Sequence, residues 1–522
     1  MLTALNIFLV CGSAWLTTLA FPPHNLFGLA FGSLLPFFGV IYREPSYKNT
    51  FLYALLFGLV FYLRLLVSLL ELRLYVSPVL IFCGWLFLAL AQALFIAVAI
   101  LLGKFIQRHP VFKGFPASLT DILGYAFAWV FLDWLRSLGG SGFTLGGLAY
   151  SQYLFTDFIQ LARLTGPYGL TLILVLLNVF WGVLLARLID QRQNPKITRA
   201  EWIDWGIAAS VLLLATGLII LGGGLTIYFQ NRQTAKPVER KLVTVFQPAV
   251  PQEDKLSLAA HADLKTQYLE DIRAFSQTAT TDLLVLPETI LGEFLLNNKE
   301  FMFALRDALD FSIIFGVPRQ DELSPDFRYY NSVALVNRYG GVTILHDKKY
   351  LVPFGEYLPG KFLFSWLVAA SGFFDSEYTT GRKDSSRETG YAAAICFEST
   401  FPYQTRDQIG RGGRLLLVLT NDAWFGQAPF LDMHLSCAVL RAVENNRYAV
   451  QSANTGRSAI IDNHGRILRL SSLNAKEWLT AETVLLTRKT IYTYFGELAV
   501  YLALVFFCLY FYLLLFKEGK GR

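Results

Sequence analysis

Long apolar stretches dominate the first 230 residues and return near the carboxyl terminus. A helix needs roughly 20 apolar residues to cross a hydrocarbon core about 30 Å thick. The pattern therefore predicts an α-helical membrane bundle of about eight transmembrane helices, at residues 3–20, 26–42, 51–72, 77–103, 118–136, 159–187, 204–229 and 493–516. We expect the first stretch to be a retained helix rather than a signal peptide, because it lacks a basic start and another apolar stretch follows at once.

A different periodicity sets in at residue 241. Short β-rich runs alternate there with amphipathic runs typical of helices, which predicts a layered α/β domain. The strands are expected at 241–247, 282–287, 311–317, 331–337, 341–346, 391–395, 415–420, 447–453 and 458–462, and the helices at 259–279, 299–310 and 430–446. Arg338-Tyr339-Gly340 between two of these runs is a hairpin signal. We therefore expect transmembrane helices 1–7 in residues 1–230, an extramembrane domain at 241–485 and transmembrane helix 8 at 493–516.

Composition and charge support this division. Hydrophobic residues make up 54% of the chain and charged residues only 16%, whereas a soluble globular protein is roughly 25% charged. The net charge of +6 does not point to nucleic acid, because Lys and Arg gather at the ends of the apolar stretches. They concentrate near 43–48, 104–113 and 187–199 and after residue 516, and the opposite short loops hold little beyond Arg73 and Arg136. The positive-inside rule then places both termini in the cytoplasm and the α/β domain outside it.

Arg136 leaves two interpretations open. It ends the segment Asp133-Trp134-Leu135-Arg136, and the Gly-rich connection 139–143 follows it. It could be a snorkelling side chain beside an ordinary loop. Alternatively, it could meet a lipid phosphate or support an active site near the membrane surface.

Cysteine and histidine spacing predicts neither disulfides nor a metal. The five cysteines show no CxxC pairing, and the six histidines show no metal-ligand spacing. We expect no metal and no cofactor. Cys396 is left as a candidate nucleophile.

Three titratable residues mark the candidate chemistry. Glu288 ends the apolar run LVLPE, Lys348 precedes LVPFGE, and Cys396 ends AAAICFE. Polar residues just past strand ends lie where α/β folds usually place their chemistry. Glu288 could act as a general base, while Lys348 could lower the thiol pKa and stabilise an oxyanion. Each residue alone is more often a core cysteine, a surface acid or a solvated lysine, so the prediction depends on the three together.

The order Glu, Lys, Cys on an α/β domain resembles the nitrilase or carbon–nitrogen hydrolase superfamily. A closer resemblance, over nearly the whole chain, is to the apolipoprotein N-acyltransferases of bacterial membranes. The stretches that carry it are DWLRSLGGSGF at 133–143, GGLAYSQ at 146–152, LPE at 286–288, LVPFGEYLP at 351–359, ICFE at 395–398 and LTNDAWFG at 419–426. The resemblance implies a nitrilase-like αββα sandwich beside the membrane helices.

The resemblance also implies residue roles. Glu288 would be the general base, Lys348 the charge-stabilising lysine and Cys396 the nucleophile. Glu356 would hold the lysine and the intermediate, and Glu398 would be a further required acid. Phe397, Asn421 and Trp424 would contact substrate, although Asn421 and Trp424 could equally form a structural turn.

Three positions depart from the family pattern. Phe397 stands where relatives often have Tyr, Tyr350 where many have His, and Leu256 where a Trp is common in a mobile arm. Separately, His434 and Arg441 lie seven residues apart on one face of a predicted helix, which favours scaffolding for both.

The reaction implied by the resemblance is a two-step acyl transfer. Cys396 would take the sn-1 acyl chain of a phospholipid, expected to be phosphatidylethanolamine, and pass it to the α-amino group of a diacylglyceryl-apolipoprotein. The setting would be the bacterial inner membrane. One rival is a membrane-tethered amidase of the carbon–nitrogen hydrolase type. A transporter is disfavoured, because the apolar stretches are almost free of ionisable residues, with Arg64 the clearest exception.

Overall fold

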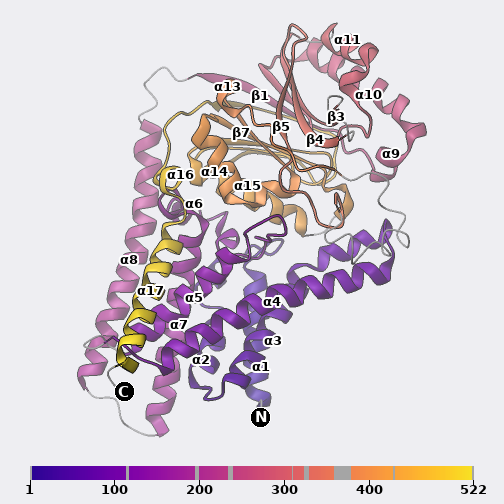
Figure 1. Cartoon of the computed structure of the whole chain (residues 1–522). Coiled ribbons are helices and arrows are strands. Elements are labelled where there is room, and N and C mark those ends of the chain that lie inside the picture. Colours follow the sequence, from indigo (N-terminus) through magenta and orange to yellow (C-terminus); the bar gives the residue numbers. More distant parts are fainter. Residues whose placement is uncertain are drawn as a thin grey trace. The chain divides into compact units, whose positions relative to one another are not determined.

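The structure is a computed structural model that describes residues 3–112, 117–193, 199–232, 239–307, 310–321, 328–357, 378–426 and 429–519. The chain divides into two compact units (Figure 1). The helical unit consists of Met1–Leu70, Val79–Asn231 and Phe495–Arg522, and the α/β unit of Glu71–Pro78 and Arg232–Tyr494. Some of the basic loop positions near 113 and 196 and after 519 lie outside the described residues.

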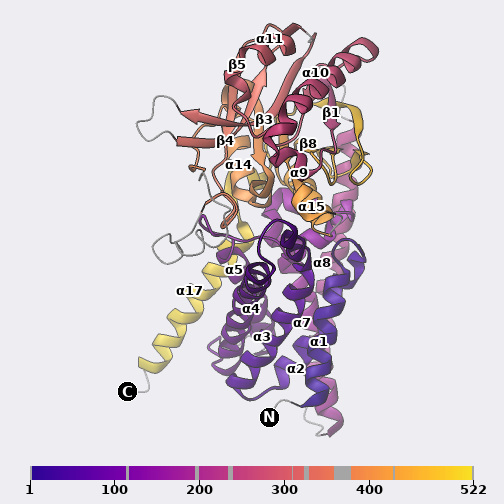
Figure 2. The same cartoon turned by 90° about the vertical axis from the view of Figure 1, so that its right-hand side faces the viewer.

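Helices occupy all eight of the predicted apolar stretches. They are α1 (Ala4–Leu19), η1 (Phe27–Phe31), α2 (Leu35–Arg43), α3 (Tyr47–Leu65), η2 (Val67–Leu74), α4 (Pro78–Arg108), α5 (Ala117–Leu135), α7 (Ala162–Gln193), α8 (Arg199–Arg232) and α17 (Leu498–Gly519). The short helices η3 (Leu148–Gln152) and α6 (Thr156–Ile159) lie in the connection between α5 and α7. α1 packs on α3 and α2 packs on α7 (Figure 2). By length and composition, α3, α4, α7, α8 and α17 could each cross a membrane, while the helices at Ala4–Leu19 and Phe27–Arg43 are shorter.

Two of the predicted stretches are interrupted by glycines with positive φ. The stretch at 159–187 breaks at Gly166, whose φ is +66°, directly before Pro167. A proline disfavours helical backbone in the preceding residue, and glycine accepts the left-handed alternative. Near the carboxyl end, α16 (Ile491–Phe495) stops before Gly496, whose φ is +75°, and α17 begins at Leu498. Each interruption starts a new helix rather than ending the apolar stretch.

Arg136 is buried within the helical unit. Its side chain bonds Asp133 at 2.8 Å and donates to the carbonyls of Phe143 at 2.9 Å and Leu145 at 3.0 Å. Arg136 thereby fastens the Gly-rich connection to the end of α5. A snorkelling side chain would instead extend its guanidinium toward water, so that interpretation does not describe this arginine.

The α/β unit contains two sheets. The six-stranded sheet has the order β11-β1-β2-β3-β4-β5, and the five-stranded sheet has the order β10-β9-β8-β7-β6. The strands are β1 (Arg240–Gln247), β2 (Leu283–Val285), β3 (Ser312–Asp321), β4 (Arg328–Val336), β5 (Val342–Asp347), β6 (Tyr391–Ile395), β7 (Leu415–Thr420), β8 (Tyr448–Ala453), β9 (Ala459–Ile461), β10 (Ile467–Leu470) and β11 (Glu477–Val484). β4 and β5 pair antiparallel, which confirms the predicted hairpin.

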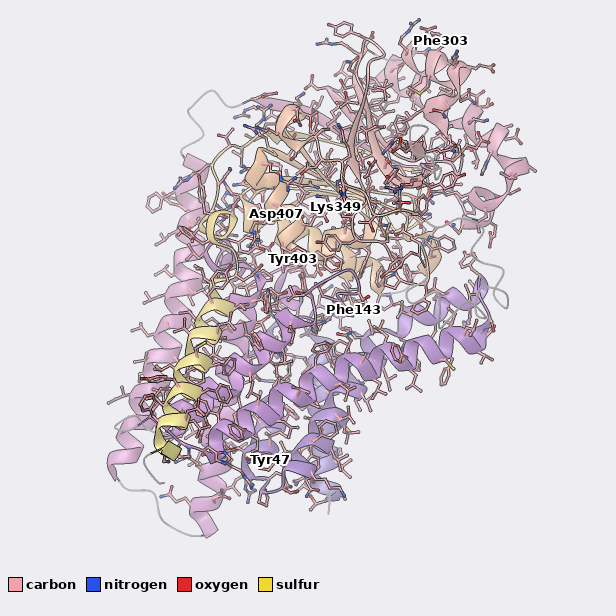
Figure 3. All side chains as sticks on the ribbon, viewed as in Figure 1. Tyr47, Phe143, Phe303, Lys349, Tyr403 and Asp407 are labelled. Carbon is pink, nitrogen blue, oxygen red and sulfur yellow. The ribbon has the colours of Figure 1, made fainter. Side chains whose placement is uncertain are left out.

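The two sheets pack face to face. Val285 and Ile314 of the first sheet share one buried apolar cluster with Ile395 and Leu417 of the second. Helices α10 (His261–Thr278) and α11 (Lys299–Asp307) cover the outer face of the first sheet, and α14 (Pro402–Arg411) and α15 (Phe430–Asn445) cover the second (Figure 1). Phe303 of α11 points away from this core (Figure 3). The arrangement confirms the predicted αββα sandwich.

Candidate active site

The candidate residues follow the ends of strands in both sheets. Glu288 comes three residues after β2, Lys348 directly after β5 and Cys396 directly after β6. The Lys348 Nζ lies 3.4 Å from the Glu288 carboxylate and 2.7 Å from that of Glu356. The structure therefore brings together side chains that lie 60 positions apart in the sequence.

Glu288 is held by three donors. Its carboxylate accepts hydrogen bonds from Asn331 Nδ2 at 2.7 Å and from the Asn421 backbone N–H at 2.9 Å, in addition to Lys348. Gly316 on β3 permits this close packing, because a Cβ at that position would lie 2.5 Å from the Glu288 Cα. Hydrogen bonds from several donors fix the orientation of a carboxylate.

Lys348 keeps its charge although it is almost fully buried. Burial lowers the pKa of Lys348, but Glu288, Glu356 and Cys396 raise it well above its usual range. Burial raises the pKa of Glu356, and the neighbouring Lys348 opposes that rise. The cluster thus holds one fixed ammonium between two carboxylates, where developing negative charge on a substrate could be stabilised.

The Cys396 thiol is protonated at rest. Burial and then Glu288 raise its pKa far above the usual range, while Lys348 and a hydrogen bond with the Thr420 hydroxyl lower it. Lys348 therefore acts on the thiol pKa in the predicted direction, but burial outweighs it. A thiol in this state needs a base to become a nucleophile, and Glu288 is the carboxylate with the largest electrostatic effect on it.

Comparison with known proteins identifies the family. Residues 13–180 match the model described as "Apolipoprotein N-acyltransferase N-terminal domain", and residues 242–491 match "Carbon-nitrogen hydrolase". The apolipoprotein N-acyltransferase of Rhodopseudomonas palustris is 31% identical over 79% of this chain and 76% of its own length. The chain belongs to the apolipoprotein N-acyltransferase family.

Other relatives extend this match. The apolipoprotein N-acyltransferase of Thermotoga maritima is 28% identical over 96% of this chain and 92% of its own. Among solved structures, Saccharomyces cerevisiae Nit3, a member of branch 10 of the nitrilase superfamily, matches with a TM-score of 0.35 and 18% identity over 48% of this chain and 92% of its own. The family match thus spans both the helical unit and the α/β unit.

Glu398 joins the nucleophile turn to the loop that carries Lys348. One carboxylate oxygen accepts from the Lys349 N–H at 2.6 Å and the Tyr350 N–H at 3.1 Å, and the other from the Ile395 N–H at 2.9 Å. Burial raises its pKa, but His346, which is 2.9 Å away, and these backbone bonds lower it more. Figure 3 labels Lys349 in this region, together with Tyr403 and Asp407 of α14.

The residues expected to contact substrate have protein partners. Asn421 Nδ2 donates to Gln252 Oε1 at 3.0 Å, and its Oδ1 accepts from Asn454 at 3.0 Å. The Trp424 ring lies 5.1 Å from that of Tyr75, and the Phe397 ring 5.1 Å from that of Phe401. Asn421 is therefore fixed as part of the scaffold around Glu288, and a substrate role for all three remains a prediction.

Three further polar residues surround the carboxylates and were not predicted. Asn331 donates to both Glu288 and Glu356. Burial lowers the pKa of Lys255 to about 7, and its Nζ lies 3.3 Å from the Glu288 carbonyl. Burial raises the pKa of Tyr378 to about 12, with Glu356 and Glu288 adding to the rise. Asn331 begins the predicted strand NSVALVN, the only sequence signal that could have indicated it.

The described part of the chain contains no group of three or more His, Cys, Asp or Glu side chains arranged to hold a metal ion. The site's positive charge comes instead from Lys348. Leu256, where a Trp was expected from the family pattern, is 58% exposed on α9 (Gln252–Leu256).

Proposed function

We propose that this protein transfers the sn-1 acyl chain of a phospholipid, with phosphatidylethanolamine as the expected donor, to the α-amino group of the S-diacylglyceryl-cysteine of a lipoprotein. Family membership supports the reaction class. The observation that carries the mechanism is the close pair of Glu288 and Lys348, 3.4 Å apart, both of which act electrostatically on the Cys396 thiol.

The first half-reaction acylates the cysteine. Glu288 takes the proton from the Cys396 thiol, and the sulfur attacks the ester carbonyl of the phospholipid. The carbonyl oxygen becomes an oxyanion, which Lys348 stabilises. When the tetrahedral intermediate collapses, the C–O ester bond breaks and Glu288 returns the proton to the departing lysophospholipid oxygen. The enzyme is left with a thioester on Cys396.

The second half-reaction forms the amide. The neutral α-amino group of the acceptor attacks the thioester carbonyl, and Lys348 again faces the oxyanion. Glu288 accepts a proton from the attacking nitrogen and gives it to the sulfur as the C–S bond breaks. The products are the N-acylated lipoprotein and the free thiol of Cys396. Glu356, which bonds Lys348 at 2.7 Å, keeps the ammonium in place through both steps.

We further propose that residues 241–485 carry the chemistry, while residues 1–230 and 493–516 anchor the protein in the bacterial inner membrane. Both substrates are lipids, so an anchored domain can reach them at the bilayer surface. The basic loops near 43–48, 104–113 and 187–199 support cytoplasmic termini and an extracytoplasmic catalytic domain.

This topology predicts a labelling pattern. In a background with Cys83, Cys396 and Cys508 replaced by alanine, Gln277→Cys and Lys48→Cys place thiols at exposed positions of α10 and α3. A membrane-impermeant maleimide added to intact spheroplasts is expected to label the first variant, and the second only after lysis. The reverse pattern, read by gel shift, would refute the proposed orientation.

The activity is tested by separating thioester formation from its discharge. Purified protein in detergent, incubated with phosphatidylethanolamine, is expected to gain one acyl chain on Cys396 in intact and peptide mass spectra. A diacylated lipopeptide with a free amino terminus should then remove the chain and appear as the triacylated product. The same lipopeptide with an acetylated amino terminus is the matched control and should leave the thioester in place. If water hydrolysed the thioester at the same rate in the presence of either peptide, the amidase alternative would be favoured.

A further inference from the structure

A buried histidine lies directly behind the nucleophile. His434 on α15 has no exposed surface, and its Nε2 is 2.9 Å from the backbone carbonyl oxygen of Cys396. Its Nδ1 is 3.2 Å from Oδ1 of Asp422, which is also fully buried and begins η7 (Asp422–Phe425). The mechanism above uses neither side chain.

The protonation of the His434 ring depends on its hydrogen-bond partners. A carbonyl oxygen and a carboxylate only accept hydrogen bonds, so a ring that donates to both is an imidazolium, whereas a hydroxyl that donates to Nε2 leaves the ring neutral. The other groups facing it are the hydroxyls of Ser399 at 2.8 Å and Thr420 at 3.5 Å. Burial alone lowers the pKa of His434, but Asp422, the Cys396 carbonyl and Glu288 raise it above its ordinary value.

One of the residues around His434 is also hydrogen-bonded to the Cys396 thiol. The Thr420 hydroxyl donates to Asp422 Oδ1 at 2.8 Å, and it also makes a hydrogen bond with the Cys396 thiol. His434 therefore contacts the Cys396 carbonyl and Thr420 contacts its sulfur, while Asp422 bonds both of them. A group of this form can set both the backbone and the side-chain direction of one residue.

Cys396 needs such support. Its φ is +51°, in the left-handed region that non-glycine residues rarely adopt. A conformation of this kind persists only where the surrounding structure holds it. Glu398 fixes the preceding residue by accepting from the Ile395 N–H. His434 is the group that holds the Cys396 carbonyl itself.

We propose that His434, held by Asp422 and Thr420, is a positioning residue that aims the Cys396 thiol at the acyl carbonyl. The proposal rests on the proposed function and deepens it. It replaces the expectation that His434 is only scaffolding. Arg441, on the same helix, fits that expectation, because it bonds the Thr400 carbonyl at 3.1 Å and Glu444 at 2.7 Å, away from the nucleophile.

Two substitutions of His434 distinguish its contact with the Cys396 carbonyl from its contact with Asp422. Gln at position 434 can place an N–H near the Nε2 position and keep the bond to the Cys396 carbonyl. Asn can reach only the Nδ1 position, so it keeps the contact with Asp422 and loses the carbonyl. We expect His434→Asn to slow single-turnover thioester formation about 100-fold, the cost typical of a misplaced reacting group, with the half-saturating phospholipid concentration unchanged. His434→Gln should lie within about tenfold of the unmodified protein.

Alkylation of Cys396 gives a readout that does not depend on the substrate. Both variants replace a ring whose protonated form places a positive charge beside Asp422, so the pH needed for a given rate of Cys396 alkylation by iodoacetamide, measured by mass spectrometry, should rise in both. Met433→Leu, a volume-conserving change on the same helix, is the matched control and should match the unmodified protein in rate and profile.

Two results would overturn the positioning role. One is acylation at the unmodified rate in His434→Asn. The other is an equal loss of acylation rate in the Asn and Gln variants that follows the fall in their thermal unfolding midpoints, with no change in the alkylation profile. A failure of the proposed function would give a different result. The unmodified protein would then form no thioester, while the alkylation profiles would still separate the two His434 variants from Met433→Leu.

Discussion

A Cys396→Ala variant is expected to form no thioester and to transfer no acyl chain, a loss on the order of 10⁶-fold, as for nucleophiles of other covalent enzymes. The reason is that Glu288 and Lys348 have no other nucleophile to act on in the proposed mechanism. The substitution removes only one sulfur atom and introduces no larger side chain. The thermal unfolding midpoint should therefore change little, and the loss should appear in intact mass spectra after incubation with phospholipid.

Cysteine chemistry elsewhere in the chain provides the control for this variant. Cys83 on α4 and Cys508 on α17 are exposed, and neither belongs to the α/β unit. Cys83→Ala should therefore acylate Cys396 at the unmodified rate. Acyl transfer that survived in Cys396→Ala would show that another group carries the chain, and the proposed mechanism would fail.

Strands buried on both faces could be predicted to the residue. The runs YAAAI and LLLVLT became β6 and β7 with the predicted bounds, because a strand covered on both faces is apolar throughout. Two strands were missed. β10 and β11 lie at the ends of their sheets and are partly exposed, so their sequences ILRL and EWLTAETV carry no continuous apolar signal. The helix α14 was missed for a similar reason, since its sequence PYQTRDQIGR is mostly polar.

The candidate catalytic residues could be predicted from their positions, and Glu356 and Glu398 from the resemblance, but the buried histidines behind them could not. Cys396 and Glu288 follow apolar strands, where a reactive side chain stands out from its surroundings. His346 and His434 lie inside a strand and a helix, and their partners Glu398 and Asp422 are 52 and 12 residues away. Position on one helix face does not tell which group lies opposite it in the fold. Scaffolding was therefore the natural prediction for His434, and only its contact with the Cys396 carbonyl suggests the positioning role proposed above.

The supports also explain why the thiol is not a preformed thiolate. Burial raises the pKa of Cys396 most, Glu288 and then Asp422 raise it further, and Lys348 and Thr420 oppose the rise. A thiol that stays protonated until a substrate arrives is protected from oxidation and from stray electrophiles. The same state makes the enzyme depend on its base, because proton removal must accompany attack on the ester.

That dependence predicts a large effect of Glu288→Gln. The amide has the shape of the carboxylate but cannot accept the thiol proton at neutral pH. We expect single-turnover thioester formation to slow about 10²- to 10⁴-fold, the usual contribution of a positioned base. The fit also worsens, because Glu288 accepts from Asn331, Asn421 and Lys348, and an amide must turn its NH₂ group toward one of these donors. Quenched-flow mass spectrometry of the Cys396 peptide measures the rate.

Glu293→Gln is the matched control for this change. Glu293 lies five residues further along and is about one-third exposed. It pairs with His261 at 3.2 Å and Lys265 at 2.9 Å, away from the thiol. Losing this outer ion pair should leave thioester formation within about twofold, since exposed ion pairs contribute little. If Glu288→Gln acylated as fast as Glu293→Gln, Glu288 could not be the base. Because burial leaves the Cys396 thiol protonated, its proton would then need another acceptor, and Lys255, whose pKa burial lowers to about 7, would be the first residue to test.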